Sequence, residues 1–170
     1  MPAATRLREN APLIRRHQHE KSESSGGNVK HMLAREGSFA GDVYELQQRY
    51  RRGIQQMTLA MYRLEVPAIA AINGPAIGAG LDLACMCDIR IGSTHAKVGS
   101  TFVNLGIIPG DGGAWFLPRL IGIQRAAELM FSGRIVAPGE SLALGLMMEV
   151  TEPDALLPRA REIAAQFAGK

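Results

Sequence analysis

Residues 66–88 read VPAIAAINGPAIGAGLDLACMCD and contain a short apolar run, a glycine-rich turn and a helix-like segment in succession. The apolar run, residues 68–72, is typical of a strand that is buried on both faces. Residues 79–87 have helical composition, and the glycines before them let backbone N–H groups approach a ligand closely. These N–H groups would lie at a helix N-terminus, where the helix dipole favours negative charge. The stretch therefore predicts a strand–turn–helix junction that binds an anion, or an oxygen that becomes one.

The whole chain has the length and composition of one globular domain. It contains 170 residues, of which 46% are apolar and 21% are charged, and this is too apolar for general disorder. The net charge is only +3 and the basic residues are scattered, so nucleic-acid binding is not expected. The longest apolar region, residues 66–91, carries charged residues and several glycines, so we expect no membrane-spanning segment.

The two cysteines indicate a reducing compartment. Cys85 and Cys87 lie two positions apart in the predicted helix, point to different faces and cannot form a disulfide with each other. They lack the further ligands that a metal site needs, and so do His17 and His19 in the polar N-terminal segment. We therefore predict buried cysteines, no metal site and a cytoplasmic protein.

The first half of the chain divides into a polar segment and a helical segment. Residues 1–24 are rich in Arg, His, Glu and Ser, and we interpret them as a disordered leader. The glutamates in this leader argue against an organelle transit peptide. Residues 25–28 form a turn in which Asn28 is suited to cap a helix that begins at Val29. Apolar residues then recur every three or four positions over residues 43–64, which predicts one amphipathic helix of about 20 residues.

The second half of the chain alternates short strands with helices. Extended segments are expected at residues 88–92, 96–99, 134–136 and 149–151, with a loop at residues 106–113. Helices are expected directly after this loop and at residues 124–131, 138–143 and 153–168. Strands that alternate with helices favour an α/β fold.

Three common ligand-binding motifs are absent from the sequence. A dinucleotide-binding fingerprint would need a third glycine three positions after Gly80, and Leu83 occupies that position. No Lys-Ser or Lys-Thr pair follows a glycine loop, which excludes a P-loop, and no G-x-S-x-G nucleophile elbow is present. The chemistry is therefore expected to involve the backbone turns.

Two glycine turns, at residues 25–28 and 78–80, each precede a predicted helix. Two convergent N–H donors are what a developing thioester oxyanion needs, because stabilising this charge is commonly the largest contribution to catalysis. Glycine turns before helices are also common packing devices, so the spacing alone leaves both interpretations open.

Four segments resemble the crotonase superfamily, also called the enoyl-CoA hydratase/isomerase family. They are SGGNVK at residues 25–30, NGPAIGAGLDLACMCDI at residues 73–89, GIIPGDGG at residues 106–113 and FSGR at residues 131–134. The resemblance implies a crotonase-like (ClpP/crotonase) α/β fold, a spiral of ββα units that is incomplete here, over residues 25–170. It also implies binding of an acyl-CoA substrate, no further cofactor, and assembly as a homotrimer or hexamer.

The resemblance assigns the oxyanion hole to the backbone N–H groups of Gly27 and Ala79. Six further residues match positions that shape the two turns or border the bound thioester: Ser25, Gly26, Asn28, Val29, Gly78 and Gly80. Phe102 and Trp115 are expected to line the substrate pocket, with core packing as the alternative role of Trp115.

Asp82 and Asp111 are the predicted catalytic residues. The two catalytic glutamates of hydratases in this family match Asp82, a shorter acid, and Phe102, which cannot transfer a proton. Asp111 is the expected substitute, because isomerase relatives use an aspartate in this loop, although one position earlier. The alternatives are a structural hydrogen bond for Asp82 and a helix cap for Asp111.

The leading hypothesis is enoyl-CoA isomerase or hydratase chemistry through a stabilised enolate, as in fatty acid metabolism. A plain hydratase is less favoured, because adding water across a double bond needs two placed groups. The alternative is a catalytically inactive crotonase fragment that serves as a subunit or interaction scaffold, since neither end of the chain resembles the outer strands and helices of the family. A serine peptidase of the related ClpP architecture would need a serine where Ala79 lies.

Overall fold

The computed structural model describes residues 28–168. Its α-helices are α2 (Val29–Ala34), α3 (Val43–Arg52), α4 (Ile54–Tyr62), α5 (Ala79–Met86), α6 (Gly113–Ile121), α7 (Ile123–Ser132), α8 (Pro138–Ala143) and α9 (Pro153–Ala168). Its strands are β1 (Ile69–Ile72), β2 (Pro75–Ile77), β3 (Ile89–Ser93), β4 (Lys97–Gly99) and β5 (Glu149–Thr151). Two 3₁₀ helices are η1 (Gly37–Phe39) and η2 (Thr101–Leu105). The predicted α/β class is confirmed.

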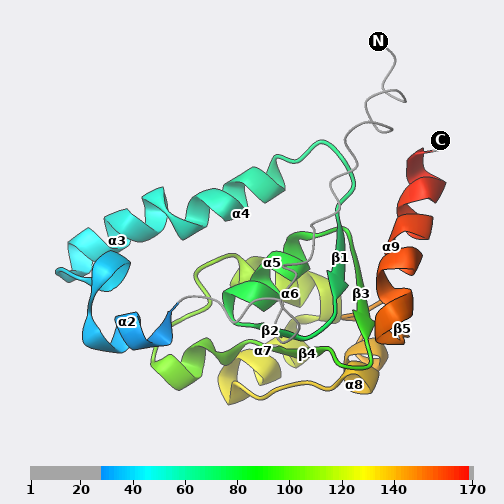
Figure 1. Ribbon diagram of the computed structural model, residues 1–170. Coiled ribbons are helices and arrows are strands. Elements are labelled where there is room, and N and C mark those ends of the chain that lie inside the picture. Colours follow the sequence, from blue (N-terminus) through cyan, green and yellow to red (C-terminus); the bar gives the residue numbers. More distant parts are fainter. Residues whose placement is uncertain (1–27, 169–170) are drawn as a thin grey trace, which may run out of the picture.

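Two successive ββα units form the centre of the molecule (Figure 1). The first consists of β1, β2 and α5, and the second consists of β3, β4 and the helices that follow them. Each strand of the first unit pairs in parallel with its counterpart in the second, β1 with β3 and β2 with β4. Strand β5 extends the first sheet by pairing in parallel with β3. Each ββα unit therefore adds one strand to each of the two parallel sheets.

The sheet β1–β3–β5 is buried between helices on both faces, as Figure 1 shows. On one face, Ile69 and Ile91 pack with Leu156 and Ile163 of α9. On the other face, Ala70 and Ile72 belong to the larger core cluster, which includes buried residues of α5, α6 and α7. Burial on both faces explains why strand β1 has an unbroken apolar sequence.

Helices α3 and α4 run end to end as an arm along one side of the molecule (Figure 1). The sequence predicts one continuous helix here, and this prediction is wrong at Gly53, where the backbone leaves the helical region (φ −109°, ψ −110°). A Cβ atom at Gly53 would lie 2.7 Å from the carbonyl oxygen of Arg49. The break therefore depends on the missing side chain. Helix α3 begins with a capping box in which Asp42 and Glu45 exchange hydrogen bonds.

Strand β2 and the two 3₁₀ helices are not indicated by the sequence. The sequence places the three residues of β2 in the glycine turn, since Pro75 lies between two glycines. Proline is tolerated as the first residue of a strand because it need not donate a ladder hydrogen bond there. Residues 79–86, 89–93, 138–143, 149–151 and 153–168 adopt the predicted helices and strands to within two residues. The cap at Asn28 is also confirmed, because its Oδ1 accepts from the N–H groups of Lys30 and His31.

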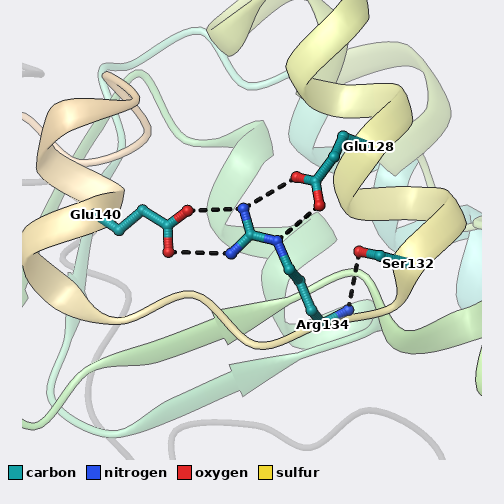
Figure 2. A network of polar contacts seen from close by, with 4 residues as sticks. All are labelled: Glu128, Ser132, Arg134 and Glu140. Atoms are coloured by element: carbon teal, nitrogen blue, oxygen red, sulfur yellow. Dashed lines mark hydrogen bonds and ion pairs between the residues drawn. The ribbon is translucent and has the colours of Figure 1, made fainter.

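Arg134, the last residue of the FSGR segment, connects α7 with α8 through its side chain. Its guanidinium makes paired hydrogen bonds at 2.7–3.0 Å with Glu128 of α7 and with Glu140 of α8, and its N–H donates to Ser132 (Figure 2). These bonds lower the pKa of both glutamates. The contacts hold the linker between the two helices in place.

Three sequence predictions concern the termini, the thiols and the membrane. The leader at residues 1–24 lies outside the described residues, and so do Ser25, Gly26 and Gly27. Cys85 and Cys87 are buried free thiols, and burial raises their pKa to about 12 and about 11. Within residues 28–168, no helix combines the length and the apolarity needed to cross a membrane.

Candidate active site

The turn before α5 has the conformation that its glycines predict. Gly78 has φ 57° and ψ −121°, in the left-handed half of backbone space that favours glycine. Its N–H donates to the carbonyl oxygen of Gly99 at 2.8 Å, which ties the turn to the end of β4. Ala79 is the first residue of α5, so its N–H has no carbonyl partner within the helix. The buried Gly80 follows directly.

A cavity of about 610 Å³ lies between the arm and the start of α5. Ala79 and Leu83 of α5 line one side, and Asp111 of the 106–112 loop lies beside them. Asn28 and Tyr50 belong to the opposite wall, together with other residues of α2, α3 and α4. The structure therefore brings together three of the predicted site residues, Asn28, Ala79 and Asp111.

A second cavity, of about 560 Å³, adjoins the first and is largely apolar. Phe102 of η2 lines it, together with Leu105, Ile107 and Ile108. Four residues line both cavities and mark their junction: Met32, Phe39, Tyr50 and Asp111. Phe102 therefore lines a candidate pocket, to which it contributes an apolar wall.

The carboxyl group of Asp111 lies at this junction without a fixed partner. Only 5% of the residue is exposed, and its Oδ1 has no hydrogen-bond partner among residues 28–168. Burial raises the pKa of this carboxyl above its ordinary value. Tyr50 lines both cavities together with Asp111. Burial and then the charge of Asp111 raise the pKa of the Tyr50 phenol. A buried acid with a raised pKa and a free oxygen is suited to accept and return a proton.

Asp82 occupies a different environment from Asp111. It is 1% exposed and lines neither cavity, and its Oδ2 accepts from the N–H of Gly113 at 2.9 Å. A Cβ atom at Gly113 would collide with this carboxyl group, so only glycine permits the contact. Burial raises the pKa of Asp82 to about 7, opposed by the Gly113 hydrogen bond and assisted by the charge of Asp111. The structural hydrogen bond that the sequence left as an alternative is therefore present.

The remaining predicted residues lie around or away from the cavities. Val29 is exposed in the first turn of α2. Trp115 lines neither cavity: it is 54% exposed, and the Arg119 guanidinium lies 3.3 Å from the centre of its ring. Its side chain therefore does not line these two cavities, and core packing, the alternative role, is not observed either. In the described part of the chain, no group of three or more His, Cys, Asp or Glu residues could hold a metal ion.

Three polar residues of the arm contribute to the site without a signal in the sequence. Tyr50 fits the apolar pattern of the predicted helix, and Gln55 and Thr58 belong to no motif. Gln55 donates to the carbonyl oxygen of Gly110 at 3.2 Å, and the hydroxyl of Thr58 donates to that of Asp111 at 2.5 Å. These contacts join residues more than 50 positions apart, so no local signal could identify them.

Comparison with known protein families agrees with this geometry. A sequence model of the family described as Enoyl-CoA hydratase/isomerase matches residues 19–170. Crotonyl-CoA hydratase of Syntrophomonas wolfei is 36% identical over 151 residues, which cover 89% of this chain and 55% of that protein. An enoyl-CoA isomerase/hydratase of Mycosarcoma maydis is 38% identical over 168 residues, which cover 98% of this chain and 56% of that protein.

Solved structures show the same relationship. An enoyl-CoA hydratase/isomerase from Cupriavidus metallidurans matches with a TM-score of 0.79 and 37% identity, over 97% of this chain and 61% of that chain. Enoyl-CoA hydratase from Bacillus anthracis matches with a TM-score of 0.78 and 35% identity, over 89% and 56%. The chain spans about half the length of the curated relatives it matches, and its fold is a partial crotonase-like fold. This chain belongs to the enoyl-CoA hydratase/isomerase family.

Proposed function

We propose that the chain binds acyl-CoA thioesters and performs isomerase-type or hydratase-type chemistry through a stabilised enolate. One observation supports this most directly. The start of α5 at Ala79 and the buried carboxyl of Asp111 line the same cavity. Such a cavity offers both an N–H donor for a developing oxyanion and a group that transfers a proton.

In the proposed mechanism, the Ala79 N–H donates to the thioester oxygen as negative charge develops there. The Gly27 N–H, predicted from the sequence, would supply the second donor. Asp111 removes a proton from one carbon of the acyl chain and returns it to another, so one acid serves both steps. Isomerisation by a single acid fits the residues at the junction better than hydration, because Phe102 replaces the second acid and cannot hold a water molecule.

Asp82 has an indirect role in this proposal. Its hydrogen bond to the Gly113 N–H joins the first turn of α5 to the first turn of α6. Gly113 lies two residues after Asp111, so the contact also fixes one end of the loop that carries the catalytic acid. We therefore assign proton transfer to Asp111 and the positioning of the loop to Asp82.

We also propose the substrate-binding surfaces, the assembly state and the location of the protein. The reaction needs no cofactor beyond the coenzyme A of the substrate. The apolar cavity beside Asp111 would accommodate the acyl chain, with Phe102 in its wall. Asn28 and Val29 would border the coenzyme A, as Ser25 would, and Gly26 would shape the first oxyanion turn. A homotrimer or hexamer is expected from the family resemblance, and a cytoplasmic location is expected from the two reduced cysteines.

The experiment is an assay of the purified chain with 3-enoyl-CoA and crotonyl-CoA. We expect turnover of 3-enoyl-CoA to fall by about 100-fold or more in Asp111→Asn, the usual contribution of a general acid–base group. The exposed Glu65→Gln variant provides a matched carboxyl-to-amide control and should behave like the parent. Equal turnover by the parent and Asp111→Asn would refute the role of Asp111. Absence of turnover together with absence of saturable acyl-CoA binding would favour the inactive scaffold.

A further inference from the structure

Two side chains of α4 hold the backbone of the loop that carries Asp111. The Gln55 amide donates to the carbonyl oxygen of Gly110 at 3.2 Å, and the Thr58 hydroxyl donates to the carbonyl oxygen of Asp111 at 2.5 Å. The two donors are three residues apart, so they lie on the same face of α4. They bind successive carbonyl groups of the loop.

The methyl group of Thr58 faces Gly112 of the same loop. Gly112 has φ 118°, and a Cβ atom there would lie 3.0 Å from Cγ2 of Thr58 and 2.9 Å from Cε of Met86. The loop therefore passes closely between α4 and the end of α5. Thr58 fixes it through a hydrogen bond and through packing.

These contacts matter because the carboxyl group of Asp111 is not held directly. Its Oδ1 has no hydrogen-bond partner among the described residues, although only 5% of the residue is exposed. The direction of the carboxyl therefore depends on the position of its own backbone. In reactions of bound substrates, a displacement of about 1 Å can lower the rate by about 100-fold.

The arm is only partly buried against the core. None of the described residues in α2, α3 and α4 is fully buried. Met61 of α4 packs against the main core cluster, so this apolar contact and the two hydrogen bonds together set the distance between α4 and the loop. Helix α4 also packs against α5, whose first residue is Ala79. The same helix thus contacts both parts of the candidate site.

We propose that Thr58 and Gln55 are positioning residues. They hold the backbone of residues 110–111 so that the Asp111 carboxyl faces the cavity that Ala79 also lines. This inference rests on the proposed function for its kinetic consequence. The structural consequence, a fixed backbone position for the buried Asp111, holds for the free protein.

The test compares Thr58→Val, which keeps the shape but loses the hydroxyl, with Thr58→Ser, which keeps the hydroxyl. Gln55→Leu tests the second contact. Gln56→Leu is its matched control, since the exposed Gln56 donates within the arm to the carbonyl oxygen of Arg51. The first readout is the titration of the Asp111 carboxyl by carbon NMR in the free protein. We expect its pKa to move toward the ordinary value in Thr58→Val and Gln55→Leu, and to stay unchanged in Thr58→Ser and Gln56→Leu.

The second readout is kinetic. We expect kcat for 3-enoyl-CoA to fall about tenfold or more in Thr58→Val, with KM within about twofold of the parent, and to recover in Thr58→Ser. Unchanged titration and unchanged kcat in both Thr58→Val and Gln55→Leu would overturn the proposal. If no variant, the parent included, turns over substrate, the proposed function fails, and the NMR titration still decides whether α4 positions Asp111. Should Thr58→Val fail to fold, Gln55→Leu decides both readouts alone.

Discussion

Replacing Asp82 by Asn should change how the stability of the protein depends on pH. Burial raises the pKa of this carboxyl from 3.8 to about 7 in the folded chain. The folded state therefore binds more protons than the unfolded state between these two pH values. Stability contributed by this group is fully present below pH 3.8 and is lost as the pH rises through about 7. The full loss corresponds to up to about 4 kcal/mol of unfolding free energy.

The Asp82→Asn variant should lack this loss. An amide remains neutral at all these pH values, and its oxygen still accepts from the N–H of Gly113. At pH 8, Asp82→Asn should therefore be more stable than the parent by as much as about 4 kcal/mol, and at pH 4 the two should be nearly equal. Asp82→Ala should instead be less stable than Asp82→Asn by about 1–3 kcal/mol at both pH values, because it leaves the Gly113 N–H without a partner.

The measurement is urea unfolding, followed by circular dichroism, of the parent and both variants at several pH values from 4 to 8. The difference between the parent and Asp82→Asn reports on this carboxyl and on its charge interaction with Asp111, since all other titrating groups are shared. A difference that is the same at pH 4 and pH 8 would show that Asp82 does not have a raised pKa. The assignment of a buried, loop-positioning carboxyl would then be wrong.

Two further predictions concern the neighbours of the acids. Gly113→Ala should destabilise the fold by about 1–3 kcal/mol, because the new Cβ atom would collide with the Asp82 carboxyl. Thermal or urea unfolding measures this change, and an unchanged stability would contradict the close contact. Asp111→Asn should lower the pKa of the Tyr50 phenol by removing a nearby negative charge. Ultraviolet titration of the tyrosines, with Tyr50→Phe to identify the signal, would show no change if the two side chains were not close.

The central part of the fold could be predicted from local sequence signals. The apolar run of β1, the glycines before Ala79 and the Asn28 cap each act on neighbouring residues, and all three have the expected structure. The break at Gly53 could not be predicted, because the apolar period continues across it. The helix ends there because the φ and ψ angles of Gly53 leave the helical region. Short strands such as β2 depend on a partner strand, which a local pattern does not specify.

The candidate site was predicted in its residue types but not in its geometry. Ala79 and Asp111 line the same cavity. Asp82 instead accepts a hydrogen bond from the N–H of Gly113, which lies 31 residues further along the chain. Whether an acid faces a cavity or a helix end depends on such distant contacts. The roles of Asp82, Thr58 and Gln55 therefore emerge only from the folded chain.

The most direct test of the proposed enolate is the exchange of α-protons of butyryl-CoA with deuterated water. This saturated thioester cannot be hydrated or isomerised, so exchange reports only on proton removal and enolate stabilisation. The parent and Glu65→Gln should catalyse exchange at similar rates, and Asp111→Asn should be slower by about 100-fold or more. Exchange no faster than without protein, or an equal rate in Asp111→Asn, would contradict the proposal that Ala79 and Asp111 form an enolate-stabilising site.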